Sequence, residues 1–251
     1  MTDLKVAFRG LKAAYRRELA AYFGAPIAYL FLTVFLVALG VFTWEGARYF
    51  DTGAVDLAPF FLWHPWLFMI FLPALAMRLW ADEYSDGTAE LLLSLPVGLA
   101  GLVTGKFLAA WSVALVALAF TLPMWITANY LGAPDNTAIA LTYAMSALMA
   151  GAYLAIGAAA SALTRRQVSA VVLAVVLAFL FTAAGWPVIL AGLADVFGAA
   201  FADAVARFSF LTHFESAQRG VLEAEALVFF LSTIVLFLTL NALWVSRRRA
   251  A

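Results

Sequence analysis

The side chains whose types and spacing could do chemistry gather in residues 78–106, the one long polar segment of an otherwise apolar chain. Four carboxylates stand close together in this segment: Asp82, Glu83, Asp86 and Glu90. A chain that concentrates its charge in one segment is expected to contact something soluble there. The first question is whether this segment, or any other, carries a catalytic or nucleotide-binding motif.

No such motif is found. Gly98 and the pair Gly105-Lys106 faintly resemble a phosphate loop, but the first glycine is misplaced, and Phe107 stands where a hydroxyl must reach magnesium. The two histidines, His64 and His213, lack the spacing of a zinc hydrolase, and the chain has no cysteine. We therefore expect no catalytic residues, no metal site and no cofactor in this chain.

The composition makes the bilayer the solvent of this protein. Of 251 residues, 66% are hydrophobic and 12% are charged, with a mean hydropathy of +0.97. A soluble domain of this length cannot bury so much apolar surface. Each crossing needs about 20 apolar residues. We predict an all-α integral membrane protein whose six membrane-spanning helices lie at residues 25–44, 59–80, 105–131, 139–163, 168–190 and 225–246.

Lysine and arginine set the orientation of these spans, because they are retained on the cytoplasmic side. With six spans both termini share one side, and that side collects most of the basic residues. They are Lys5, Arg9, Lys12, Arg16, Arg17, Arg78, Lys106, Arg165, Arg166, Arg247, Arg248 and Arg249, against Arg48, Arg207 and Arg219 on the other side. The termini and the loop at 81–104 are therefore predicted to be cytoplasmic.

Residues 1–24 precede the first span and have helical periodicity. Apolar residues recur every three or four positions, beside the basic residues Lys5, Arg9, Lys12, Arg16 and Arg17. The pattern predicts an amphipathic helix in the cytoplasmic interface. A simple basic tail is the alternative.

The connection at 191–224 has a second apolar pattern, formed by Phe197, Phe201, Val205 and Phe208 at helical spacing. It predicts a helix that half-embeds in the outer leaflet or re-enters it. An ordinary amphipathic surface helix is equally compatible.

The polar segment itself contains a turn and a short helix. Gly87 allows the turn, Thr88 can cap the helix, and Pro96 stops it. Leu91, Leu92 and Leu95 form an apolar face. A short amphipathic helix between two spans suits docking into a groove of a soluble partner, although a loop helix lying on the membrane has the same pattern.

These residues resemble a known family. The run Glu83…Gly87-Thr88-Ala89-Glu90-Leu91…Leu95-Pro96-Val97, followed by Gly105-Lys106, is similar to the cytoplasmic segment of ABC-2 type transporter permeases, and so is Glu18–Tyr29. The stretch Pro65–Trp80 is most similar to the gliding-motility subgroup. The resemblance covers essentially the whole chain.

The resemblance implies how the protein is driven. Such permeases dimerise, and the first cytoplasmic loop of each is a coupling helix that contacts a separate ABC ATPase, which binds ATP and magnesium. The coupling residues would be Glu83, Gly87, Thr88, Glu90, Leu91, Leu92, Leu95 and Pro96. Residues 1–24 would be the connector helix, residues 25–251 the six-span domain, and residues 191–224 re-entrant outer helices between spans five and six.

Further expectations follow from this resemblance. The partners would be the ATPase, a second permease copy or paralogue, membrane lipids and an envelope accessory protein, without nucleic acid, in a bacterial inner membrane. The apolar spans favour a lipid-like or amphiphilic substrate moving outward. Asn129, Thr121 and Thr127 are polar candidates for its path, although such residues more often bond neighbouring helices. From its position between Trp63 and Pro65, and not from the resemblance, His64 is interpreted as a solvated histidine near the outer interface, with a proton relay or metal ligand as the alternative.

Two other functions remain open. The complex could transmit ATP-driven force to an envelope partner without moving a solute. The chain could also be a membrane scaffold or an enzyme unrelated to ATP, although the missing catalytic motif argues against it.

Overall fold

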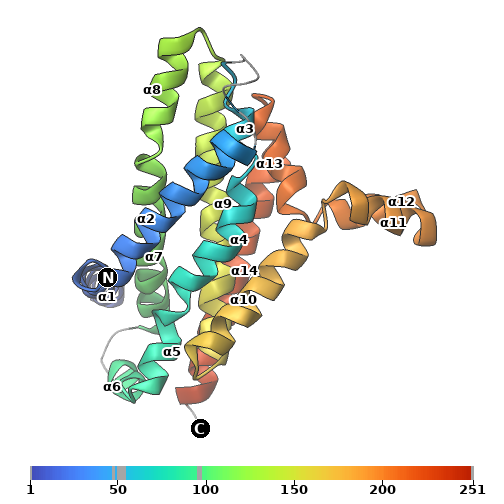
Figure 1. The fold of residues 1–251 in the computed structure, drawn as a ribbon. Coiled ribbons are helices and arrows are strands. Elements are labelled where there is room, and N and C mark those ends of the chain that lie inside the picture. Colours follow the sequence, from blue (N-terminus) through green and yellow to red (C-terminus); the bar gives the residue numbers. More distant parts are fainter. Residues whose placement is uncertain (1, 47–48, 50–54, 95–97, 250–251) are drawn as a thin grey trace.

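The computed structural model describes residues 2–46, 49, 55–94 and 98–249 of the chain, and these residues form helices without a strand. Figure 1 shows the helices as an upright bundle with a short hairpin projecting from one side. The bounds are α1 Thr2–Gly24, α2 Pro26–Val41, η1 Phe42–Gly46, α3 Ala58–Phe61, α4 His64–Ala76, α5 Arg78–Ser85, α6 Ala89–Ser94, α7 Leu99–Ala119, α8 Leu122–Leu131, α9 Asn136–Leu163, α10 Gln167–Ala183, α11 Pro187–Phe197, α12 Ala199–Ala206, α13 Phe210–Gln218 and α14 Ala224–Arg249.

Five helical segments in the described part of the chain are long and apolar enough to cross a membrane: Ala28–Gly46, Ala58–Ser85, Leu99–Leu131, Asn136–Leu163 and Ala224–Arg248. A sixth is obtained if α10 and α11 count as one span, although they meet at an angle of 71°. The protein is therefore an all-helical, multi-pass membrane protein with five or six candidate spans.

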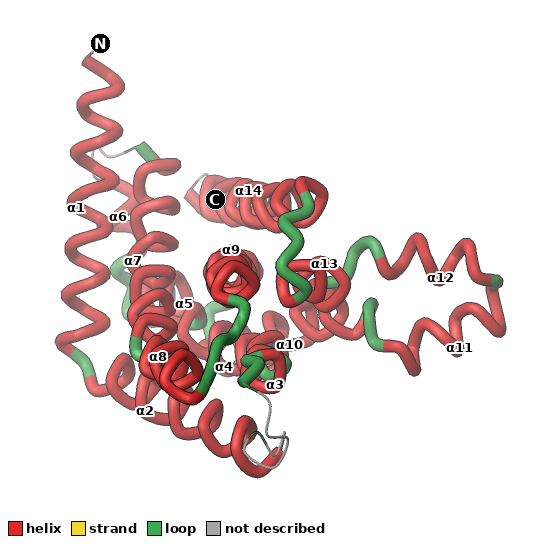
Figure 2. Tube along the Cα trace, turned by 90° about the horizontal axis from the view of Figure 1, so that it is seen from above, coloured by secondary structure: helices red, strands yellow, loops and turns green. Residues whose placement is uncertain are grey.

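Helix α9 is the centre of the bundle. Figure 2 shows it surrounded by α4, α5, α7, α10, α13 and α14. It begins where Asp135 accepts hydrogen bonds from the backbone N–H groups of Thr137 and Ala138. Its second half is buried and rich in Ala, Gly and Ser. Small side chains let neighbouring helices approach closely: a Cβ on Gly157 would lie 2.6 Å from the Cβ of Ala76.

The hairpin of α11 and α12 differs from the predicted continuation of span five to residue 190. Helix α10 ends at Ala183, because Gly185 lies too close to Ser209 for any side chain and Pro187 starts a new helix. The predicted apolar stripe is also divided, since Gly198 turns the backbone at a φ of +88° after Phe197. Among the residues of α11, none is buried, and Figure 1 shows both helices leaving the bundle sideways, below the level of α8.

The interpretation of His64 as a solvated histidine is wrong. The imidazole is fully buried at the start of α4, and its ring lies against those of Phe60, Phe61 and Phe68. Neither ring nitrogen makes a hydrogen bond of full geometry to a described residue, although the backbone of Phe60 and Phe61 lies within weak hydrogen-bonding reach. Phenylalanines that precede and follow His64 in the sequence cover its ring. Its predicted place near the end of a span did not show that it would be buried.

Candidate functional site: a charged junction at the basic end of the bundle

A buried cation joins two helices at the basic end of the bundle. The Nζ of Lys106, in the second turn of α7, lies 2.8 Å from the Oε2 of Glu18 on α1 and 3.0 Å from the Oε1 of Glu83 on α5. The Lys106 side chain is 2% exposed, and those of its two partners are 12% and 11% exposed. An ion at this depth needs opposite charges around it, because its hydration has been removed.

Glu83 extends this network to two further segments. Its carboxylate accepts hydrogen bonds from the guanidinium of Arg17 on α1 and from the hydroxyl of Thr88, which stands directly before α6. One carboxylate thus contacts α1, α7 and the start of α6, and we call Glu18, Lys106, Glu83, Arg17 and Thr88 the charged junction. Two cations and two anions balance its formal charge.

Helix α1 is held against α7 by shape as well as charge. Figures 1 and 2 show α1 lying across the bundle axis, end-on in one view and along its length in the other. A Cβ on Gly105 would lie 2.8 Å from both the backbone oxygen of Leu11 and the Cβ of Ala14, so glycine permits the close approach. The hydroxyls of Tyr15 and Ser112 lie 3.1 Å apart. Gly105-Lys106 is therefore a helix-packing element.

The start of α5 is tied to the central helix. The Oγ of Ser161 on α9 accepts hydrogen bonds from the backbone N–H groups of Trp80 and Ala81, at 3.1 and 3.0 Å, and donates one to the carbonyl oxygen of Met77. The Lys106 ammonium also lies 5.4 Å from the centre of the Trp80 ring. Helix α5 therefore connects the junction to the core of the spans.

Two more spans meet α5. Asp82 accepts hydrogen bonds from the Nε of Arg78, at 2.9 Å, and from the amide of Gln167 at the start of α10. The guanidinium of Arg248 on α14 lies 4.4 Å from the centre of the Tyr84 ring. A movement of α5 would therefore change its contacts with α10 and α14 as well as those with α1 and α7.

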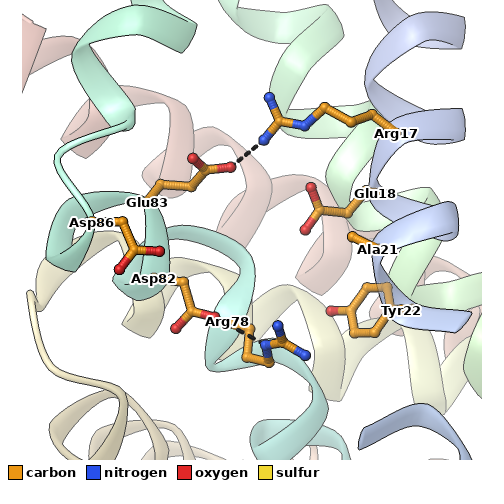
Figure 3. A pocket seen from close by; sticks show the side chains of 8 residues that line it. All are labelled: Arg17, Glu18, Ala21, Tyr22, Arg78, Asp82, Glu83 and Asp86. Carbon is orange, nitrogen blue, oxygen red and sulfur yellow. Dashed lines mark hydrogen bonds and ion pairs between the residues drawn. The ribbon is translucent and has the colours of Figure 1, made fainter. Parts of the chain in front are cut away.

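A polar cavity of about 180 Å³ lies between α1 and α5. Figure 3 shows its side chains converging from the two helices, with the Arg17–Glu83 contact at one end and Arg78 at the other. It is lined by Arg17, Glu18, Ala21, Tyr22, Arg78, Asp82, Glu83 and Asp86. No group of three or more His, Asp or Glu residues in the described ranges is placed to hold a metal ion.

The predicted docking segment is a turn and short helix at the surface. Gly87 has a φ of +70°, which favours glycine, and Gly87, Thr88 and Glu90 are all exposed. Leu92 is only 6% exposed and faces a hollow lined by α1 and α7 residues, so this leucine is not available to a partner. The exposed surface described here is acidic instead of apolar.

Other predicted site residues fall into two groups. Lys12, Arg16 and Arg17 are exposed on α1, but only Arg17 among them belongs to the charged junction. The side chains of Lys5, Arg9 and Leu91, and all of Leu95 and Pro96, lie outside the described residues.

Sequence reasoning missed Glu18 and the role of Lys106. A signal was present, because Glu18 lies at helical spacing from Leu11, Tyr15 and Tyr22, on the apolar stripe instead of the basic one. A carboxylate on a buried stripe requires a cation, and Lys106 follows the loop.

The polar residues suggested for a substrate path bond to their own surroundings. Thr121 donates to the carbonyl oxygen of Leu118, and Thr127 donates to that of Pro123. Asn129 exchanges amide hydrogen bonds with Asn136 at the turn between α8 and α9. These contacts give no support to a substrate role.

Comparison with known protein families gives a match that includes part of the charged junction. The sequence model described as "ABC-2 family transporter protein" matches residues 64–246, which is most of the chain and includes α5, α6 and α7. Among curated proteins, none matches the chain.

Proposed function

Because the chain belongs to the ABC-2 transporter family, we propose that it is the permease subunit of an exporter driven by a separate ATPase chain. Membership makes the chain a transmembrane component of an ABC transporter, not itself catalytic, with an ABC ATPase subunit as its partner. It confirms the family resemblance read from the sequence, while the gliding-motility subgroup stays a prediction.

The observation that carries the proposal is the contact set of Glu83. This carboxylate bonds Thr88 at the exposed turn, Arg17 on α1 and Lys106 on α7. A displacement of the turn by a soluble partner would therefore pass directly to α1 and α7. The Ser161 hydrogen bonds carry it from α5 to the central helix α9.

The proposed mechanism uses this path in an alternating cycle. ATP binding closes two ATPase subunits, which pull the exposed segment around Gly87, Thr88 and Glu90. Helix α5 moves with it, and the spans open or close a path at the interface of two permease copies. The exposed carboxylate of Glu90 suits a basic groove on the ATPase.

The direction, cargo and setting are part of the proposal. The positive-inside pattern supports cytoplasmic termini in a bacterial inner membrane. The surface of the spans is apolar and aromatic, which favours a lipid-like or amphiphilic substrate moving outward. Force transmission to an envelope partner is the second candidate, and the sideways hairpin of α11 and α12 is the described feature that could contact such a partner.

Co-expression with the ATPase encoded beside its gene tests the proposal. The expected result is a complex that copurifies, hydrolyses ATP and moves a cargo in reconstituted vesicles. Absence of any copurifying ATPase would overturn the permease function. A complex that hydrolyses ATP but neither retains nor moves a cargo would favour force transmission.

A further inference from the structure

Two hollows of opposite character lie on the same side of the bundle. The polar cavity between α1 and α5 is one of them. The second is an apolar groove of about 310 Å³ between α2 and α4. It is lined by Leu30, Phe31, Val34, Phe71, Ala74, Leu75 and Met77.

The two hollows follow one another along a single helix face. Phe71 and Leu75 line the groove, and Arg78, Asp82 and Asp86 line the cavity. The first four succeed one another every three or four positions, so they lie on one face of α4 and α5, and Asp86 follows at the C-cap of α5. The facing wall is α2 beside the groove and α1 beside the cavity, and these helices are joined at Ala25.

Tyr22 stands where the hollows meet. Its ring lines the cavity, and its hydroxyl donates a hydrogen bond of 2.9 Å to the carbonyl oxygen of Leu75, which lines the groove. A polar hollow at the basic end and an apolar one toward the middle of the bundle are therefore neighbours, with the Tyr22 side chain between them. That is the amphipathic pattern of a lipid molecule in one leaflet.

The charges of the cavity specify the head group. Arg17 pairs with Glu83, and Arg78 pairs with Asp82. Glu18 pairs with Lys106, and Asp86 is exposed and forms no ion pair with a described residue, so one negative charge of the lining is unbalanced. A head group that carries both an ammonium and a phosphate complements this lining, whereas a purely anionic head group meets net repulsion.

We propose that this crevice binds a phospholipid with an ethanolamine head group, taken from the leaflet at the basic end of the bundle. The ammonium is bound by Asp86 and Asp82, the phosphate by Arg78 and Arg17, and an acyl chain by the groove. Ethanolamine is favoured over choline because its ammonium can donate hydrogen bonds to carboxylates, which a quaternary ammonium cannot.

The main alternative occupant is a basic side chain of the ATPase subunit. It would satisfy Asp86 but would leave the adjoining apolar groove without an explanation. The lipid accounts for both hollows at once. The proposal requires only that the chain is embedded in a membrane, so it is independent of ATP-driven transport.

Native mass spectrometry of the purified chain tests the site, with ethanolamine, choline and glycerol phospholipids of identical acyl chains supplied in equal amounts. The ethanolamine lipid should be retained preferentially. Asp86→Asn should lower that preference about threefold, as expected for an exposed charge. Val34→Trp should fill the groove and lower retention of all three lipids.

Matched controls separate the site from general lipid contact. Asp195→Asn alters an exposed acid on α11, and Val172→Trp alters an exposed valine on α10, and neither should change retention. Equal retention of the three lipids, or Asp86→Asn and Val34→Trp variants that behave like the controls, would overturn the proposal. An Asp86→Asn variant that keeps the lipid preference but loses the ATPase would assign the cavity to the partner instead.

Discussion

The ammonium group of Lys106 lies 2.8 Å from the carboxylate of Glu18, so a cation buried in the second turn of α7 holds an anion on α1. Because the same ammonium is 3.0 Å from Glu83, the connection reaches α5 as well. Helices α1 and α5 are thereby both fixed to one atom of α7.

Removing this cation should destabilise the protein strongly. Lys106→Met leaves two carboxylates facing each other in a buried place, and the loss of one partner of a buried ion pair costs about 3–5 kcal/mol. Thermal unfolding in detergent or nanodiscs measures the effect. Restoring neutrality with Glu18→Gln in the same chain leaves Glu83 paired with Arg17 and should recover most of the loss. An unchanged midpoint for Lys106→Met would contradict the contact.

The exposed ion pair between Arg17 and Glu83 should contribute a small interaction free energy that is specific to these two residues. Arg17 pairs with Glu83 and is half exposed, whereas its neighbour Arg16 is exposed and outside the junction. A double-mutant cycle of Arg17→Ala and Glu83→Gln should give an interaction of about 0.5 kcal/mol, because solvent screens the pair. The cycle with Arg16→Ala should give none. Equal values for the two cycles would show that Arg17 has no particular role.

The packing of α1 against α7 should depend on the absence of a side chain at Gly105. Gly105→Ala places a methyl group 2.8 Å from the backbone of α1, and overpacking of this kind costs about 1–3 kcal/mol. Gly98→Ala is the control in the same helix region, since nothing lies within 4 Å of its added Cβ. Protease accessibility of α1 and the unfolding midpoint should change only for Gly105→Ala. If both variants behave alike, α1 does not pack closely on α7.

The buried imidazole of His64 should be dispensable. Its nitrogens have only weak contacts with the backbone of Phe60 and Phe61, and an incompletely satisfied buried polar group costs about 1–3 kcal/mol. His64→Phe keeps a flat ring among aromatic neighbours and should raise the unfolding midpoint without lowering ATP hydrolysis by the complex. A stable His64→Phe variant that loses activity would instead assign this histidine a functional role.

The sequence predicted structure well where a long run of apolar residues determines a helix. The apolar runs predicted the long apolar helices, with the exception of the one expected at 168–190, and the Gly87 turn and the helix from Ala89 appear at the predicted place. The bend after Ala183 was missed although Pro187 marks a helix start in the sequence, and the close approach of Gly185 to Ser209 is visible only in the structure.

The charged junction could be predicted only in part for the same reason. Acidic residues in the loop showed that the segment contacts something, but pairing between Glu18, Lys106 and Glu83 is a property of the tertiary arrangement. The apolar face assigned to the docking helix was similarly ambiguous. The helical spacing of its leucines does not tell whether Leu92 faces a partner or the rest of the chain. The structure directs it inward.

The central claim is that the exposed segment before and within α6 couples the spans to an ATPase. Glu90 is exposed there, and Glu223 is an exposed acid near the start of α14, at the opposite end of the bundle. ATP hydrolysis by the copurified complex should be preserved in Glu223→Lys and largely lost in Glu90→Lys, with unfolding midpoints like that of the unaltered chain. A Glu90→Lys complex that forms and hydrolyses ATP normally would contradict the claim.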